Sequence, residues 1–262
     1  MNIPFIKMHG LGNDFVIVDS RQNTVPSDKD FIAKISDRRW GVGCDQFIVL
    51  DKSEKADIFM NIYNYDGSIA GACGNATRCV ASLFNDGNCV IETISGLLSC
   101  FKQGGNISVN MGKPKTNWNE IPLSSEADTT NVEIMGYNGY CVNMGNPHIV
   151  IYVDDAEKID VAEIGNKIEN NPMFPEGINV EFISKTQDGV RMRVWERGGM
   201  ITQACGSGAC AVFVACNAKK ICNNELLVHL DGGDLNISYN EKGEVLMCGA
   251  YEKSFIGEFL YD

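Results

Sequence analysis

ACGNATRC (residues 72–79) and ACGSGAC (residues 204–210) are two versions of one pattern, in which a cysteine precedes glycine and other small residues. Each leads into an apolar segment, and this order is typical of the start of a helix. A cysteine at a helix N-terminus lies beside exposed N–H groups and the positive end of the helix dipole, so its thiol pKa can fall below the free value of about 8.5. The sequence therefore suggests a pair of thiol acid/base groups, Cys73 and Cys205.

The two cysteine stretches lie about half the chain apart, and other segments recur at nearly the same interval. The recurring pairs, in the same order in both halves, are residues 12–19 with 145–154, 59–67 with 190–198, and 109–112 with 246–249. Gly-Asn and Cys-Gly pieces are common in turns, but that does not explain the shared order. We interpret the chain as two halves of similar fold, residues 1–117 and 118–250, and expect the functional site in the cleft between them.

Short β-rich segments that end at Gly, Asn or Asp make up most of the first half. The predicted strands are residues 16–19, 46–50, 58–63, 90–93, 97–101 and 107–111. Surface helices are predicted over residues 28–39, with Ser27 as N-cap, and over residues 156–170. Residues 113–130 carry two prolines and few large apolar side chains, so we expect them to connect the halves.

The helices that begin at the two cysteines, about residues 74–85 and 206–219, are apolar on most sides. A helix that is apolar all round is usually buried. We therefore predict an α+β fold with two pseudo-symmetric halves, each a mostly antiparallel sheet rolled around a central helix. The cysteine would lie at the exposed start of that helix.

The composition is that of a soluble globular protein, with 262 residues, 44% hydrophobic and 21% charged. A net charge of −12 argues against binding to nucleic acid or to an anionic membrane. We see no signal peptide and no apolar run of about 18 residues, so we expect a cytoplasmic protein. The eleven cysteines include no C-x-x-C pair and the three histidines are far apart, so most thiols should be free and a metal site is not expected.

Two cysteines at helix starts, facing one cleft, suit proton exchange at carbon. A thiolate on one face removes the proton and a thiol on the other face returns one, which inverts the centre. The helix N-termini would stabilise the developing negative charge, so no pyridoxal phosphate or other cofactor is needed. Two other interpretations stay open: a reversible disulfide, or a purely structural role as small buried residues.

Polar residues beside these motifs are further candidates for the site. Asn13 and Asn146 occupy matching Gly-Asn turns, where they either tolerate the turn or bind polar groups of a ligand. Glu196 and Arg197 are either a solvated pair or two charges that hold the ammonium and carboxylate of a zwitterion. A lone histidine such as His148 more often satisfies a local hydrogen bond than catalyses.

The sequence resembles the diaminopimelate epimerases, a pyridoxal-independent family of lysine biosynthesis. The motifs that carry the resemblance span nearly the whole chain in the family's order: MHGLGNDF (8–15), GCDQ (43–46), NYDGS (64–68), ACGN (72–75), GNPH (145–148), INVEF (178–182), ERG (196–198) and ACGSGA (204–209). The resemblance implies the fold predicted above, with the last strand, about residues 251–262, returning to the first half. It also implies inversion of the α-carbon of LL-2,6-diaminopimelate to give the meso isomer.

Carried over position by position, the resemblance implies that Cys73 and Cys205 are the catalytic thiols. The implied substrate-binding and neighbouring site residues are Asn13, Gln46, Asn64, Gly74, Asn75, Asn146, Asn179, Glu196, Arg197, Gly206 and Ser207, with His148 as a further candidate. Members of the family are often homodimers. Ala76 departs from the family, which often has glycine there, and slightly alters the first helix start.

Two alternatives remain at this point. The chain could be another racemase or isomerase of the same superfamily, although proline-racemase-like chains lack the HGLGNDF opening (residues 9–15) and phenazine-type isomerases lack the cysteine pair. It could also be a binding protein or redox switch that uses Cys73 and Cys205 as a dithiol.

Overall fold

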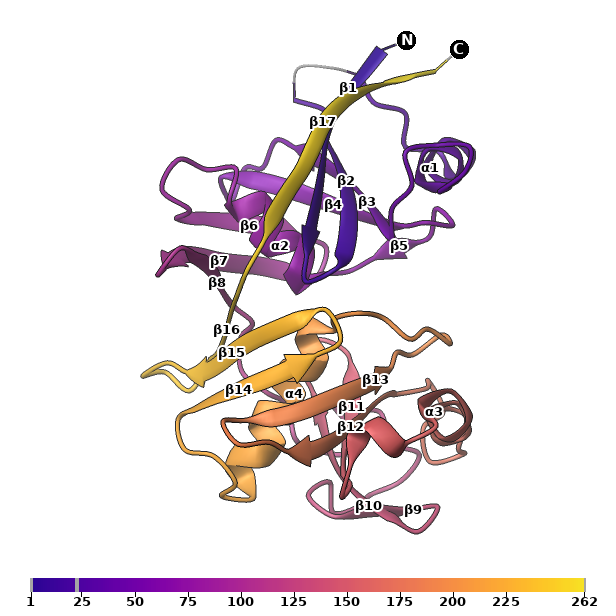
Figure 1. Cartoon of the computed structure of the whole chain (residues 1–262), viewed down its shortest axis with the longest axis vertical. Coiled ribbons are helices and arrows are strands. Elements are labelled where there is room, and N and C mark those ends of the chain that lie inside the picture. Colours follow the sequence, from indigo (N-terminus) through magenta and orange to yellow (C-terminus); the bar gives the residue numbers. More distant parts are fainter. Residues whose placement is uncertain (1, 22–23, 262) are drawn as a thin grey trace. The chain divides into compact units, whose positions relative to one another are not determined.

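The computed structural model describes residues 2–21 and 24–261. The chain divides into two compact units, Met1–Val109 with Gly249–Asp262, and Asn110–Cys248, and each unit is described here by itself (Figure 1).

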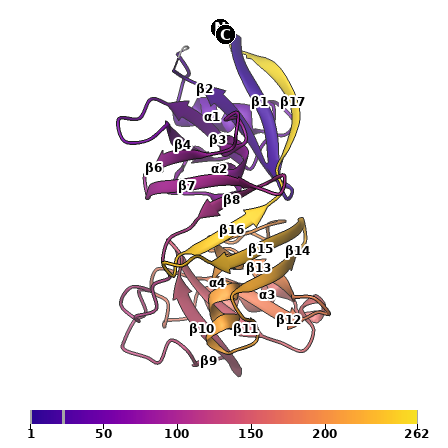
Figure 2. The same cartoon turned by 90° about the vertical axis from the view of Figure 1, so that its left-hand side faces the viewer.

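The first unit is a mixed sheet whose strands pair in a regular succession. Its strands are β1 (Asn2–Gly10), β2 (Asn13–Asp19), β3 (Gln46–Asp51), β4 (Ile58–Asn64), β5 (Ile69–Ala70), β6 (Cys89–Thr93), β7 (Gly96–Gln103), β8 (Asn106–Asn110) and β17 (Glu252–Leu260). β1 and β2 are antiparallel, β2 and β3 parallel, β3 and β4 antiparallel, β4 and β6 parallel, and β6 and β7 antiparallel. The C-terminal strand β17 runs antiparallel beside β1 (Figure 2).

The second unit repeats this succession. Its strands are β9 (Val132–Ile134), β10 (Tyr137–Asn143), β11 (Pro147–Tyr152), β12 (Asn179–Lys185), β13 (Val190–Trp195), β14 (Glu225–Leu230), β15 (Gly233–Tyr239) and β16 (Val245–Gly249). From β10 to β15 the pairings are again antiparallel, parallel, antiparallel, parallel and antiparallel. The prediction of two halves of similar fold is therefore confirmed.

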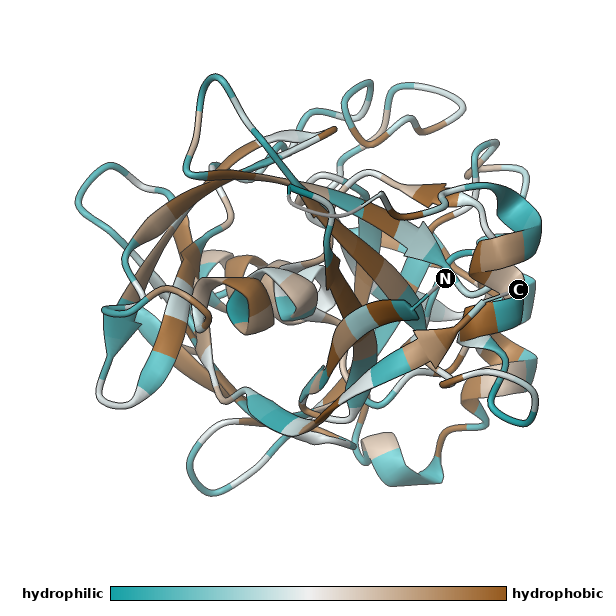
Figure 3. Ribbon diagram, turned by 90° about the horizontal axis from the view of Figure 1, so that it is seen from above, coloured by the Kyte–Doolittle hydropathy of each residue, from teal (hydrophilic) through white to brown (hydrophobic). Residues whose placement is uncertain are grey.

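Helices occupy matching places in the two units. The first helix of each unit joins two parallel strands: α1 (Lys29–Ser36) lies between β2 and β3, and α3 (Val161–Glu169) between β11 and β12. The second helix, α2 (Gly74–Ala81) or α4 (Gly206–Ala218), follows the predicted cysteine. In Figure 3 the strands curve around a central helix, and hydrophobic (brown) stretches run along the strands.

The central helices are buried as predicted, but for different reasons. In α4 the buried residues are Gly206 and every residue from Gly208 to Cys216, and all of them are apolar or small. In α2 every residue is buried, although Asn75, Thr77 and Arg78 are polar. The Thr77 hydroxyl donates to the carbonyl of Cys73 at 2.8 Å, and Arg78 Nε donates to the carbonyl of Ala250. Hydrogen bonds thus replace apolar packing on part of α2.

The helix boundaries differ from the sequence predictions at several points. The N-cap of α1 is Asp28 rather than Ser27, because the Asp28 carboxylate accepts from the N–H of Phe31. That helix ends at Ser36, where Asp37 turns the chain. The predicted helix 156–170 is broken into a 3₁₀ turn, η1 (Ala156–Lys158), and α3, because Asp155 and Asp160 each cap a separate start. Likewise, α2 ends at Ala81 rather than near residue 85.

Residues 113–130 are part of the second unit and do more than connect. Ile121 and Leu123 are buried in a core formed by β10–β13 and α3. In the first unit, the corresponding core packs Phe31 of α1 edge-to-face against Phe47 of β3, with ring centroids 5.8 Å apart. Each first helix therefore seals one face of its sheet.

The contact between α3 and β13 gives a test of the second unit. A Cβ added to Gly165 would lie 2.4 Å from Trp195 Cβ and 2.7 Å from its Cγ. We expect Gly165→Ala to lower the free energy of unfolding in urea by about 1–3 kcal/mol, because the overpacked helix must move. The exposed neighbour Asn166 is the control: Asn166→Ala should be neutral or stabilise by up to about 0.7 kcal/mol. Equal stability of the two variants would contradict the close packing.

Candidate active site

Cys73 caps the central helix of the first unit. Its backbone is extended (φ −149°, ψ 110°), and its sulfur accepts from the N–H of Ala76 at 3.5 Å. The Oδ1 atom of Asn13 lies 3.8 Å from the sulfur and accepts from Asn75 Nδ2 at 3.2 Å. The thiol is partly exposed. The structure thus brings two other predicted site residues, Asn13 and Asn75, to the Cys73 thiol.

Two further predicted residues meet at the same edge of the first sheet. Gln46 begins β3 and Asn64 ends β4, and the register places them opposite each other. The Gln46 Nε2 donates to Asn64 Oδ1 at 3.0 Å, and Asn64 Nδ2 donates to Ser68 Oγ at 2.9 Å. Because β2 and β3 are parallel, Asn13 at the start of β2 belongs to this edge too.

The second unit places its predicted residues in the same way. Asn146 precedes β11, Asn179 begins β12, and Glu196 directly follows β13. Asn179 Nδ2 donates to the carbonyl of Pro147 at 2.7 Å, and its Oδ1 accepts from the backbone N–H of Arg197 at 2.9 Å. Asn179 therefore fixes the loop that carries Glu196 and Arg197. The Arg197 side chain is exposed and donates to the carbonyl of Glu176.

Cys205 caps the second central helix but lies in a very different environment. Its sulfur accepts from the N–H of Gly208 at 3.4 Å and lies 3.7 Å from Ser207 Oγ. Burial, and then the carboxylates of Glu196 and Glu181, raise the pKa of the Cys205 thiol well above its ordinary value of 9.0. The helix start alone suggested a lowered pKa, and the structure corrects this for Cys205: desolvation and two acids outweigh the helix N–H.

The carboxyl group of Glu196 contacts the Cys205 sulfur. Burial raises the pKa of Glu196, against the effect of a hydrogen bond from Thr202 and a contact with Cys205. A carboxyl group whose pKa is raised can hold or release a proton more readily near neutral pH. No sequence motif pointed to Thr202.

A buried pair, His148 and Glu181, also lies in the second unit, and only His148 was among the predicted candidates. His148 Nδ1 is 2.7 Å from Glu181 Oε1, and both side chains are fully buried. His148 Nε2 is 2.9 Å from Asn146 Oδ1. The expected local hydrogen bond of His148 is thus present. Glu181 lies in the quoted INVEF motif, but nothing in the sequence showed that its side chain points toward Cys205.

The described residues, 2–21 and 24–261, contain no group of three or more His, Cys, Asp or Glu side chains that could hold a metal ion. Over the same part of the chain, no helix is both long and apolar enough to cross a membrane.

The fold defines a class of protein. A phenazine biosynthesis protein of the PhzF family from Bacillus anthracis matches with a TM-score of 0.72, at 15% identity and over 100% of both chains. A hydroxyproline epimerase from Agrobacterium vitis matches with a TM-score of 0.70, at 14% identity, over 98% of this chain and 92% of that one. The chain therefore has the fold of these two proteins.

The sequence comparison narrows this class. The sequence model of the family described as Diaminopimelate epimerase matches residues 5–117 and 140–254. The diaminopimelate epimerase of Rhodospirillum centenum is 45% identical over 97% of this chain and 91% of that protein, and that of Phenylobacterium zucineum is 43% identical over 98% of each. The chain belongs to the diaminopimelate epimerase family and is an isomerase.

The electrostatics of the second unit lead to a prediction. Because the carboxylate of Glu196 is the largest charge effect that raises the pKa of Cys205 after burial, Glu196→Gln should lower that pKa. The measurement is a pH titration followed by NMR of protein labelled at cysteine ¹³Cβ, with the signal assigned through Cys205→Ser.

Glu163→Gln is the matched control, since Glu163 is exposed and pairs with Lys167 on the surface of α3. It should leave the titration of Cys205 unchanged. A Cys205 midpoint that is the same in the wild type and in Glu196→Gln would contradict the arrangement described here.

Proposed function

We propose that this protein inverts the α-carbon of LL-2,6-diaminopimelate to give the meso isomer, with Cys73 and Cys205 as its two acid/base groups. One observation carries the proposal: in a family named for this reaction, each half of the chain caps its buried central helix with a cysteine. Lysine and cell-wall precursor synthesis would use the product, and the cytoplasm is the compartment we infer.

The chemistry follows from the two helix starts. The thiolate of one cysteine removes the α-proton, the carbon passes through a carbanionic state, and the thiol of the other cysteine delivers a proton to the opposite face. The backbone N–H groups of Gly74, Asn75, Gly206 and Ser207 would receive the substrate carboxylate and the charge that develops on it. The bonds balance without an electron acceptor or a cofactor.

The remaining predicted residues would recognise the rest of the substrate. Amide groups suit both the ammonium and the carboxylate ends of a diamino dicarboxylic acid, because each offers N–H donors and a carbonyl acceptor. We assign recognition of the substrate to the amides of Asn13, Gln46, Asn64, Asn146 and Asn179 and to the charged side chains of Glu196 and Arg197. His148, held between Glu181 and Asn146, would support Asn146 from behind rather than touch substrate.

Exchange in heavy water tests the proposal directly. Freshly reduced protein should introduce deuterium at the α-carbon of LL- and meso-diaminopimelate without any added cofactor, as followed by ¹H NMR. Proline, hydroxyproline and histidine, offered in parallel, should not exchange. Exchange of one of these instead would assign the protein to another branch of the superfamily.

Removal of either thiol separates the two-base scheme from the dithiol alternative. Cys73→Ala and Cys205→Ala should each reduce inversion by at least about a thousandfold, because each stereoisomer needs both an acid and a base. Cys79→Ala, which removes a buried thiol outside the proposed pair, is the control and should retain activity if it folds. A redox switch would instead show ligand binding without exchange, and a near-active single Cys73 or Cys205 variant would refute the scheme.

We infer that the protein works as a homodimer that uses β17. This strand runs beside β1 and leaves Phe255, Ile256 and Leu260 50%, 73% and 69% exposed, which is unusual for large apolar side chains on one strand. Light scattering coupled to size exclusion should give twice the chain mass, and Ile256→Lys should shift it toward the monomer. The matched change Ile94→Lys, also at an exposed isoleucine, should not. A wild-type monomer would overturn this inference.

A further inference from the structure

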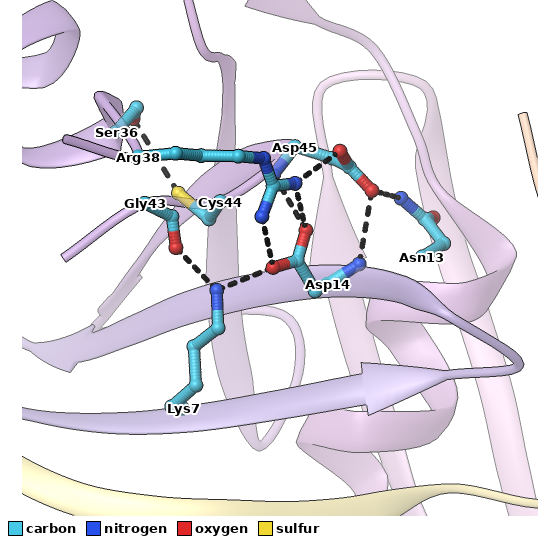
Figure 4. A network of polar contacts seen from close by, with 8 residues as sticks. All are labelled: Lys7, Asn13, Asp14, Ser36, Arg38, Gly43, Cys44 and Asp45. Carbon is cyan, nitrogen blue, oxygen red and sulfur yellow. Dashed lines mark hydrogen bonds and ion pairs between the residues drawn. The ribbon is translucent and has the colours of Figure 1, made fainter.

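Asn13 is held by a cluster of charged side chains at the start of β2 (Figure 4). Its Nδ2 group donates to Asp45 Oδ2 at 2.9 Å, and the backbone N–H of Asp14 donates to the same oxygen at 3.1 Å. The other oxygen of Asp45 is 2.8 Å from the guanidinium of Arg38. Asp45 therefore has both its oxygens engaged, one by the amide and one by the cation.

This hydrogen bond decides which end of the Asn13 amide faces Cys73. An ionised carboxylate can only accept hydrogen bonds, so the atom of Asn13 that faces Asp45 must be the nitrogen donor. The Oδ1 atom then points to the other side, where it lies 3.8 Å from Cys73 Sγ and accepts from Asn75 Nδ2. Donors and acceptors match at every contact of this amide.

The rest of the cluster holds Asp45 in place. The Asp14 carboxylate accepts from Arg38 and from Lys7 and receives the backbone N–H of Asp45 at 2.9 Å. Burial alone would raise the pKa of Asp14, but Arg38 and Lys7 outweigh it and hold that pKa well below its ordinary value of 3.8. Lys7 is itself buried and also donates to the carbonyl of Gly43. Asp14 is thus ionised in the neutral range and joins Arg38, Lys7 and the backbone of Asp45 in one network of contacts.

We propose that Asp45 is a positioning residue for Cys73, because it locks the Asn13 amide with its carbonyl oxygen toward the sulfur. A carbonyl oxygen accepts a hydrogen bond from the S–H group and disfavours the thiolate. A flipped amide would present its N–H groups to the sulfur and favour the thiolate. The N–H of Ala76 favours the thiolate of Cys73, and the carbonyl oxygen of Asn13 favours the thiol. The fixed orientation of Asn13 therefore sets both the protonation preference of Cys73 and the direction of its S–H bond. The inference rests on the proposed function for the acid/base role of Cys73.

The cluster supplies variants that separate orientation from charge. Asp45→Ala removes the acceptor and frees the amide. Asp45→Asn removes the charge, but its Oδ1 can still accept from Asn13 and from the N–H of Asp14. Arg38→Gln removes the ion pairs of Asp45 and Asp14 with Arg38 but leaves the hydrogen bonds of Asp45 with Asn13 and with the backbone N–H of Asp14, so it is the control for charge. If Asp45→Ala gives no soluble protein, Asp45→Ser takes its place. The shorter serine side chain can still accept a hydrogen bond from the backbone N–H of Asp14, but it should not reach the side-chain amide of Asn13.

Two readouts are followed in each variant. One is kcat for epimerisation. The other is the midpoint of the pH–rate profile for alkylation of Cys73 by iodoacetamide, resolved from the other cysteines by peptide mass spectrometry. Charged or titratable groups near this thiol include Cys79 and Arg78 on its own helix and the cluster of charged side chains that holds Asn13, and each variant changes only the substituted residue.

Asp45→Ala should lower kcat about tenfold, the effect of one lost hydrogen bond, and move the Cys73 midpoint to lower pH by about 0.5 to 1 unit. Asp45→Asn and Arg38→Gln should keep most of kcat. In an Asn13→Ala background, Asp45→Ala should cause no further shift of the midpoint, because the two residues act through one amide.

The proposal is overturned if Asp45→Ala leaves both readouts unchanged, or if Asp45→Asn is as impaired as Asp45→Ala, which would assign the effect to charge. An Asp45→Ala shift that persists in the Asn13→Ala background would overturn it too. Alkylation needs no turnover, so it still tests the positioning of Cys73 if the wild-type protein fails to epimerise diaminopimelate, a failure that would refute only the proposed function.

Discussion

A helix that begins inside a curved sheet must satisfy its first N–H groups there, and in both units a cysteine does so. Sulfur is a weak acceptor, and Ser, Thr, Asp and Asn are the residues usually preferred at this position. Helix stability does not explain why both helices have a cysteine at this position instead of a residue that forms a stronger cap. The N-cap position also fixes the sulfur in space, since its backbone is extended and its side chain folds back onto the first turn.

The two units share a backbone plan but give their thiols different surroundings. The register places Phe15 beside Gln46 in one unit and His148 beside Asn179 in the other, so an apolar ring corresponds to an imidazole. In addition, Cys205 lies near two acids, whereas Cys73 lies near the amides of Asn13 and Asn75. The corresponding asparagines also turn opposite ways: Asn13 directs its oxygen toward the cysteine, and Asn146 directs its oxygen to His148. A duplicated scaffold thus carries two thiols in different polar surroundings.

The sequence was informative where a structural feature depends on neighbours along the chain. Alternation and turn residues located the first-half strands to within a few residues, and the small residues after each cysteine located α4 almost to its end. It failed where two candidates for a cap stood side by side, as at Ser27 and Asp28, and where an aspartate inside a periodic stretch started a new helix, as at Asp160. It also missed β1, whose Pro4 is unfavourable in most strands.

The candidate site divides in the same way. Motifs identified the cysteines and the amides, because those residues recur at matching places in the two halves. They did not identify the roles of Asp45 or Glu181, because what these carboxylates contact depends on which strand lies alongside. Register is set by the whole sheet and cannot be read from one segment.

The charged cluster beside Asn13 makes the same point in energetic terms. Two carboxylates and two cations that are partly removed from water gain little net stability, since desolvation offsets most of their attraction, and apolar residues of similar volume would often stabilise a fold as well. Apolar residues, however, have no preferred end toward an amide. A carboxylate accepts only, so Asp45 distinguishes the nitrogen of Asn13 from its oxygen, and Arg38 pairs with the other oxygen of Asp45. The cluster is therefore better explained by the direction it gives to one amide beside the Cys73 sulfur than by the stability it adds to the first unit.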